Sequence, residues 1–148
     1  MLAREIMTKD VITVTPETTI NEVARLLVEH GVSGLPVVDA KRRVKGMVSE
    51  GDLIYQDKKL HTPAFLEILG GVIYLENPQR ISQDLNKMTA AKVAEIMTPK
   101  VYTVKEDASI EEVATIMVER QVNRVPVVDA DGQLVGIISR QDLVKAMI

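Results

Sequence analysis

The sequence has no cysteine and few aromatic residues. The absence of cysteine excludes every structure that depends on a thiol. Without cysteine, the 148 residues can form neither a disulfide framework nor a thiolate metal site. Two isolated histidines, His30 and His61, indicate no metal cluster, so we expect no metal. Aromatic residues make up 3% of the chain, as one phenylalanine and three tyrosines.

Excess positive charge and long apolar runs are also lacking. The 18 basic and 21 acidic residues give a net charge of −3, whereas a nucleic-acid binder normally carries a basic excess on one face. The longest apolar stretch is far below the roughly 20 residues of a membrane span. The first five residues lack the apolar run of a signal peptide. We therefore expect a soluble cytoplasmic protein that binds neither nucleic acid nor membrane.

The chain contains an internal repeat. Shifted by 90 residues, the sequence aligns with itself without a gap, and 22 of the 48 positions from Ile6 to Leu53 are identical to their counterparts. Ile6-Met7-Thr8 returns as Ile96-Met97-Thr98. The chain is therefore a tandem duplication, with a first repeat over 1–55, a linker over 56–92 and a second repeat over 93–148.

Each repeat reads as strand, helix, strand, strand and helix. In the first repeat we expect strands at 11–14, 35–39 and 44–48, and a final helix from Ser49. Thr19-x-x-Glu22 predicts a capping box, in which hydroxyl and carboxylate each satisfy a backbone donor, and Ser109-x-x-Glu112 repeats it. Apolar residues follow at the i, i+3, i+4, i+7 spacing of an amphipathic helix. Gly31 is the predicted end of the first such helix.

A repeat of about 50 residues is marginally stable alone, and its own helices cover one face of its sheet. We therefore expect an α/β (α+β) fold in which two pseudo-symmetric β-α-β-β-α repeats pack through their sheets as one compact module. The linker is too long for a structureless loop. We expect an apolar helix within 63–75 and a second helix over 90–97. The first would cover the module, form a dimer interface, dock a partner or form an unusual pocket.

Two strand-to-helix segments carry the candidate chemistry. They are Gly46-Met47-Val48-Ser49-Glu50-Gly51-Asp52, the first motif, and Gly136-Ile137-Ile138-Ser139-Arg140-Gln141-Asp142, the second motif. A helix start offers N–H groups to an anion. The serine can hydrogen-bond phosphate, the aspartate can accept from both ribose hydroxyls, and the glycine lets a ligand approach the backbone. The alternative is that Ser-x-x-Asp is only a helix cap.

These motifs, with the Ile-Met-Thr openings and the Pro-Val-Val-Asp strands, resemble a tandem CBS-domain pair, named after cystathionine β-synthase. The resemblance covers both repeats and not the linker. It implies a regulatory module that binds adenosine-containing nucleotides (AMP, ADP or ATP) between the repeats, needs no cofactor, forms a homodimer and signals to an effector protein. The alternative is a structural or dimerising adaptor with vestigial sites. We see no Ser–His–acid set and no Walker loop, so we expect no enzyme.

The resemblance also implies two ligand sites, each combining one repeat's motif with residues of the other repeat. The first site would contain Gly46, Met47, Ser49, Asp52, Lys100, Val101, Tyr102, Asn123 and Arg124. The second site would contain Asp10, Val11, Ile12, Ser33, Gly34, Gly136, Ile137, Ser139 and Asp142. Lys100 and Arg124 predict that the first site is the better phosphate binder. Arg124 could instead be a surface residue at a strand start.

Overall fold

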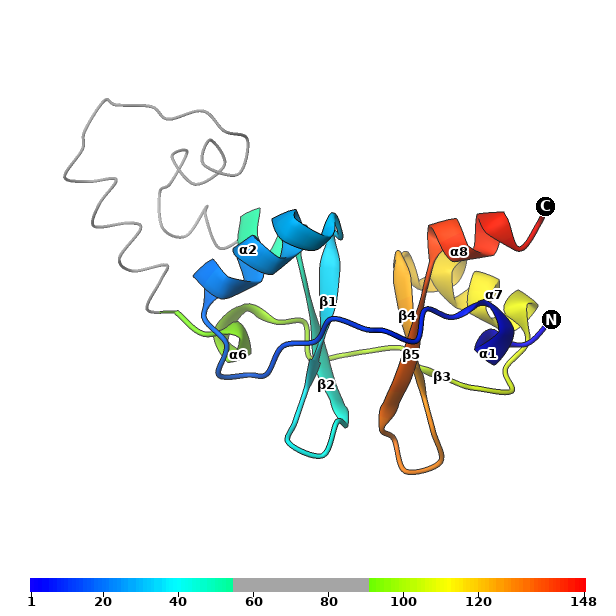
Figure 1. The fold of residues 1–148 in the computed structure, drawn as a ribbon, viewed down its shortest axis with the longest axis horizontal. Helices are drawn as coiled ribbons and strands as arrows, with labels where there is room; N and C mark the ends of the chain where they lie inside the picture. The colour runs from blue at the N-terminus through cyan, green and yellow to red at the C-terminus, as the bar shows by residue number, and fades with distance from the viewer. Residues whose placement is uncertain (55–90) are drawn as a thin grey trace. The chain divides into compact units, whose positions relative to one another are not determined.

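The computed structural model describes residues 1–54 and 91–148 (Figure 1). The elements are α1 (Ala3–Ile6), α2 (Ile20–His30), β1 (Gly34–Val38), β2 (Val44–Ser49), α6 (Val93–Ile96), β3 (Val104–Lys105), α7 (Ile110–Arg120), β4 (Arg124–Val128), β5 (Leu134–Ser139) and α8 (Arg140–Lys145). Residues 50–54 are helical as well. The predicted mixed α+β class is confirmed, whereas the linker helix expected within 63–75 lies outside the described residues.

The chain divides into two compact units, and each unit contains segments of both repeats. Unit 1 consists of Met1–Thr13, Val38–Gly46 and Pro99–Ile148. Unit 2 consists of Val14–Val37 and Met47–Thr98. The short helix α1, which opens the first repeat, therefore belongs with unit 1, and α6, which opens the second repeat, belongs with unit 2.

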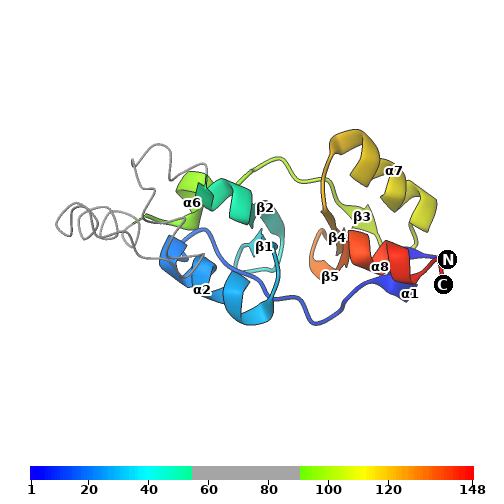
Figure 2. The ribbon, with the colours of Figure 1, turned by 90° about the horizontal axis from the view of Figure 1, so that it is seen from above.

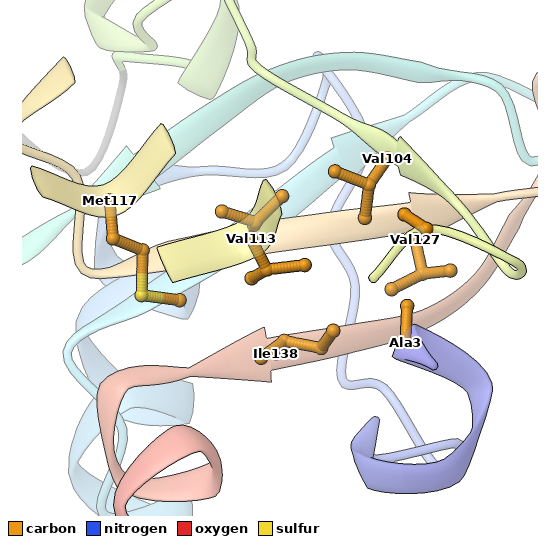
Figure 3. Close-up of a cluster of buried hydrophobic side chains, with 8 residues drawn as sticks. Ala3, Val104, Val113, Met117, Val127 and Ile138 are labelled. Atoms are coloured by element: carbon orange, nitrogen blue, oxygen red, sulfur yellow. The ribbon is translucent and has the colours of Figure 1, made fainter. Parts of the chain in front are cut away.

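Unit 1 is built on a three-stranded sheet in the order β3-β4-β5. β3 pairs in parallel with β4, and β4 pairs antiparallel with β5, placing Arg124 opposite Ser139. α7 packs on β4, while α8 and α1 pack on β5 (Figure 2). Figure 3 shows the resulting core, in which α1 contributes one residue. The cluster consists of Ala3, Val104, Ala108, Val113, Met117, Val125, Val127 and Ile138.

Unit 2 contains most of the two-stranded sheet β1-β2, of which Val38 and Val44–Gly46 belong to unit 1, with α2 and the helical residues 50–54 beside the sheet (Figure 1). The strand predicted at 11–14 is reduced to one parallel bridge between Val14 and Val37. Thr8 pairs with Ile137 in unit 1, so the residues from Thr8 to Val14 connect the units and cannot lie in one ladder. The counterpart β3 has only two residues.

The helix predicted over 90–97 is also shorter, because α6 spans only Val93–Ile96. Met97 is already extended, and Thr98 pairs with Met47 of β2. This pairing ends the helix at Ile96. Among the described residues, no helix combines the length and apolar character that crossing a membrane requires.

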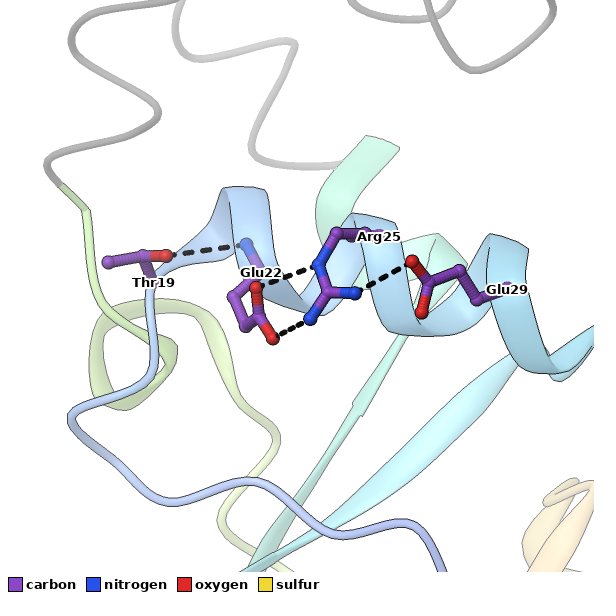
Figure 4. Close-up of polar contacts among 4 residues, drawn as sticks. All are labelled: Thr19, Glu22, Arg25 and Glu29. Atoms are coloured by element: carbon purple, nitrogen blue, oxygen red, sulfur yellow. Dashed lines mark hydrogen bonds and ion pairs between the residues drawn. The ribbon is translucent and has the colours of Figure 1, made fainter.

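The cap of α2 follows half of the predicted pattern (Figure 4). The Thr19 hydroxyl accepts the N–H of Glu22 at 3.3 Å, as predicted. The Glu22 carboxylate does not return to the cap but pairs with Arg25, whose guanidinium also donates to Glu29 at 2.7 Å. The hydrogen bond from Arg25 lowers the pKa of Glu22. The reciprocal capping box was therefore wrong here, and the carboxylate pairs instead with a charged donor. At α7 too, only the Ser109 hydroxyl forms its cap bond, accepting the N–H of Glu112.

The left-handed positions at the helix ends and in the turns are occupied by glycine in only one repeat each. Gly31 follows α2 with φ 61°, the predicted left-handed cap. Gln121 occupies the same position after α7 with φ 54°. The reverse holds in the turns, where Gly132 has φ 79° and its counterpart Arg42 has φ 60°. Each repeat therefore places a non-glycine residue in left-handed backbone at one of the two positions.

Candidate functional site

The two Ile-Met-Thr segments lie against the motifs, each against that of the other repeat. The N–H of Thr8 donates to the carbonyl oxygen of Ile137 at 2.9 Å, and the N–H of Ile137 donates back at 3.0 Å. The N–H of Met47 donates to the carbonyl oxygen of Thr98 at 3.0 Å, with a return bond of 2.8 Å. Each motif is thus joined, by the same pair of backbone bonds, to a segment from the other repeat.

The second motif forms a reciprocal cap at the start of α8. The Ser139 hydroxyl accepts the N–H of Asp142 at 3.2 Å, while Oδ2 of Asp142 accepts the N–H of Ser139 at 2.8 Å. The hydroxyl also donates to Oδ2 at 3.0 Å. The capping interpretation of Ser-x-x-Asp is therefore confirmed, and only Oδ2 of the carboxylate is used for it.

The first motif repeats this cap and adds one contact. Oδ2 of Asp52 accepts the N–H of Ser49 at 2.9 Å, and the Ser49 hydroxyl accepts the N–H of Asp52 at 3.3 Å. Oδ1 of Asp52 accepts the hydroxyl proton of Thr98 at 3.3 Å. The two motifs therefore share their caps but differ at the second carboxylate oxygen. Both aspartates are half-buried.

The residues before the Pro-Val-Val-Asp strands lie beside the motif of their own repeat. Arg124 is paired with Ser139, and the N–H of Arg140 donates to the carbonyl oxygen of Asn123 at 3.2 Å. In the first repeat, the N–H of Glu50 donates to the carbonyl oxygen of Ser33 at 2.9 Å. The sequence had grouped Asn123 and Arg124 with the first motif, and Ser33 and Gly34 with the second. The structure brings together the opposite pairs, because antiparallel pairing of neighbouring strands is local.

The opening segments follow the threonines that bond the motifs. Asp10, Val11 and Ile12 follow Thr8 after one residue; Thr8 is bonded to the second motif, and all of them lie in unit 1. Lys100, Val101 and Tyr102 follow Thr98 in the sequence but belong to unit 1, whereas Met47–Asp52 of the first motif belong to unit 2. The second group, as regrouped, lies within one unit. It consists of Asp10, Val11, Ile12, Asn123, Arg124, Gly136, Ile137, Ser139 and Asp142.

The motif glycine has a different role from the expected one in the second repeat. A Cβ on Gly136 would lie 2.4 Å from Sδ of Met7 and 2.8 Å from its Cγ. The space that we assigned to a ligand is therefore filled by the Met7 side chain. Gly136 is needed because the Ile-Met-Thr segment packs directly on β5.

Four residues near the motifs were not recognised as site residues, namely Met7, Thr8, Thr98 and Arg120. Thr8 and Thr98 bond the motifs, Met7 covers Gly136, and Arg120 contacts Tyr102. The identity of Ile-Met-Thr in both repeats was the available signal for the first three. Arg120 has no such signal, because its counterpart is His30.

Comparison with known proteins places the chain in a family. The family model described as the CBS domain matches twice, at residues 3–58 and 93–148. The chloroplastic CBS domain-containing protein CBSX1 of Arabidopsis thaliana is 36% identical, over 97% of this chain and 63% of its own length. The chain thus spans somewhat less than two thirds of that relative.

Solved structures agree with this match. A crystal structure of CBSX2 in complex with AMP, a protein of Arabidopsis thaliana, matches with a TM-score of 0.75 and 30% identity, covering 99% of this chain and 95% of that one. The CBS domain pair of protein MJ0100, in complex with 5′-methylthioadenosine and S-adenosyl-L-methionine, matches with a TM-score of 0.71 and 26% identity, with full coverage of both chains. The family model matches both repeats, and the relatives and the solved structures agree with that match. The chain belongs to the CBS-domain family.

Proposed function

We propose that this protein is a regulatory module that binds an adenosine-containing nucleotide at the second motif. The observation that supports this most directly is the assembly, within unit 1, of the segment after Thr8, the start of β4 and the second motif. The related CBSX2 and MJ0100 structures hold AMP and two other adenosine compounds, respectively. Ligand-dependent change in this unit would be read by an effector protein.

The side chains of this group supply the chemistry that a nucleotide requires. Arg124 opens β4 opposite Ser139, so a guanidinium and a hydroxyl lie at the same end of the sheet. Guanidinium is suited to bidentate phosphate contact. Asp142 uses Oδ2 for its cap, and a carboxylate has two acceptor oxygens, so Oδ1 can accept a ribose hydroxyl. The regrouping also moves the expected phosphate preference from the first site to the second.

Ligand binding to protein freed of carried-over nucleotide tests the proposal. A nucleotide at 100 times its dissociation constant adds about 2.7 kcal/mol to native-state stability, which should raise Tm by roughly 5–10 °C for a chain of this size. The panel is AMP, ADP, ATP, S-adenosylmethionine and NAD. Absence of any shift with all five would count decisively against the proposal.

Matched aspartate variants locate the site. Asp142→Asn keeps an oxygen that can accept the N–H of Ser139 but removes the carboxylate. Asp52→Asn makes the same change in the first motif. We expect Asp142→Asn to abolish the shift and Asp52→Asn to retain it. The reverse result would place the ligand at the first motif, and retention in the double variant would place it elsewhere.

Homodimer formation is the second part of the proposal, and the exposed apolar residues support it. Val28 and Val118 are counterparts in α2 and α7, and they are 67% and 77% exposed. Beside Val118, between α7 and α8, lies a cavity of about 600 Å³. It is lined by Ala114, Met117, Val118, Gln121, Arg140, Leu143 and Val144. Burial of such a face against a second copy would remove apolar surface from water.

Light scattering decides this part. Val118→Glu should convert a dimer to a monomer, whereas Lys145→Glu, an exposed change near the end of α8, should not. A dimer that shows no response to any nucleotide would favour the structural adaptor. A wild-type protein that is monomeric at micromolar concentration would overturn the dimer proposal.

A further inference from the structure

Tyr102 is the one aromatic residue in the described ranges 1–54 and 91–148, and two cations meet at its ring. Nζ of Lys100 lies 5.7 Å from the ring centroid, and Cζ of Arg120 lies 5.1 Å from it. Both distances are within the range of a cation–π contact. The ring therefore holds a lysine and an arginine from separate segments close to each other.

Neither cation has an ion-pair partner within the part of the chain that the structure describes. The ion pairs found there involve Arg25, Lys45 and Lys92. Lys100 and Arg120 are both exposed. Two like charges at one ring repel each other over distances comparable to the Debye length, about 8 Å at physiological ionic strength. An anion that contacts both would relieve this repulsion.

The pair lies next to Arg124 of the proposed nucleotide site. Arg120 ends α7, and β4 begins only four positions later at Arg124. Lys100 precedes β3, which runs parallel to β4, so Lys100 and Arg124 lie toward the same end of the sheet. Gln121, next to Arg120, lines the same cavity as Arg140. Four basic residues therefore gather at the end of the sheet where β4 begins.

The first repeat lacks this charge entirely. The counterparts of Lys100, Arg120, Arg124 and Arg140, at the offset of 90, are Asp10, His30, Gly34 and Glu50. The basic end is therefore no general requirement of the fold, because the first repeat folds in the same way with two acidic residues there. A ligand of high negative charge would be complementary to this end of the second repeat.

We propose that Lys100 and Arg120, oriented by Tyr102, bind the terminal phosphates of a nucleoside di- or triphosphate. This proposal rests on the proposed nucleotide site, since Arg124 would take the phosphate nearest the ribose. Arg120 is then a specificity-determining residue that favours ATP and ADP over AMP. The ring positions both cations without contributing charge of its own.

Calorimetric titration of wild type and Arg120→Gln with AMP, ATP and inorganic triphosphate tests the proposal. Wild type should bind ATP at least tenfold more tightly than AMP. Arg120→Gln should bring the dissociation constant for ATP to within about threefold of that for AMP, because the contact with the terminal phosphates is lost. It should leave the constant for AMP unchanged. A tenfold change in affinity corresponds to about 1.4 kcal/mol. Lys145→Gln removes the same charge on α8 and should change neither.

The outcomes separate this proposal from the nucleotide site itself. Equal affinity of wild type for ATP and AMP would overturn the terminal-phosphate site and leave the nucleotide site standing. If no adenosine ligand binds, the nucleotide site fails. The cation pair is then supported if inorganic triphosphate binds wild type and not Arg120→Gln, and overturned if it binds neither. Inorganic triphosphate that binds as tightly as ATP would overturn the assignment to a nucleotide.

Discussion

The two repeats share the same backbone arrangement but differ in the charge of the side chains at one end of their respective sheets. Thr8 and Thr98 make the same pair of backbone bonds with Ile137 and Met47. Both motifs carry the same Ser–Asp cap. Between Val93 and Leu143, five basic and nine acidic residues give a net charge of −4, yet four of those five cations lie toward one end of the sheet. Duplication therefore preserved the framework while charge diverged, so net charge does not indicate where an anion can bind.

The largest expected effect is a loss of stability on substitution in the core, where the repeats carry isoleucine and valine at equivalent positions. Ile138 and its counterpart Val48 are both fully buried. Ile138→Ala should lower the free energy of unfolding by about 2–5 kcal/mol, because it removes buried carbon atoms and leaves a cavity. Urea denaturation measures the loss.

Ile138→Val, which introduces the first repeat's residue, is the control and should cost only about 0.5–1.5 kcal/mol. A loss below 1 kcal/mol for Ile138→Ala would contradict the tight core of unit 1.

Gly136→Ala tests the close approach of the Ile-Met-Thr segment. The new methyl group would overlap the Met7 side chain, so we expect a loss of about 1–3 kcal/mol in thermal or urea unfolding. The double variant Gly136→Ala with Met7→Ala removes the overlap and should recover part of the loss. Equal stability of the single variant and wild type would show that Met7 does not pack on Gly136.

The left-handed helix ends allow a reciprocal exchange between repeats. Gln121→Gly should raise the free energy of unfolding by up to about 1 kcal/mol, since an L-residue is unfavourable at φ 54°. Gly31→Ala should lower it by a similar amount at φ 61°. Denaturation midpoints check the pair, and changes of the same sign at both positions would contradict the assignment.

The smallest expected effect is a pH dependence of stability, which arises from Asp39 in the turn of the first repeat. The backbone N–H groups of Arg43 and then Lys41, with Lys45 nearby, hold the pKa of Asp39 below its usual value. A carboxylate with a depressed native pKa stabilises the fold above its unfolded pKa, and this contribution is lost as pH falls through the native value. Tm of Asp39→Asn should therefore approach that of wild type below about pH 4. A difference that is the same at pH 3 and pH 7 would contradict this.

Local features of the fold could be predicted from sequence, and long-range pairing could not. The caps at Thr19 and Ser139 and the turn at Gly31 are determined by residues within one helical turn. The pairing of Thr8 with Ile137 joins opposite ends of the chain, and no local pattern encodes it. The same limit explains why the grouping of the site residues could not be predicted. The motif residues were recognisable, but the grouping of Arg124 with Ser139 depends on strand pairing, and the contact of Arg120 with Tyr102 depends on packing.

The exchange of short helices makes the two halves of the chain complementary fragments. A polypeptide ending at residue 54 carries α1, whose Ala3 belongs to the core around Ile138, and a polypeptide starting at residue 91 carries α6, whose Val93 is fully buried against residues of the first repeat. Neither fragment alone contains a complete unit. We therefore expect a chain cleaved between the repeats to stay assembled as a non-covalent pair, in which each half supplies a helix that the other lacks.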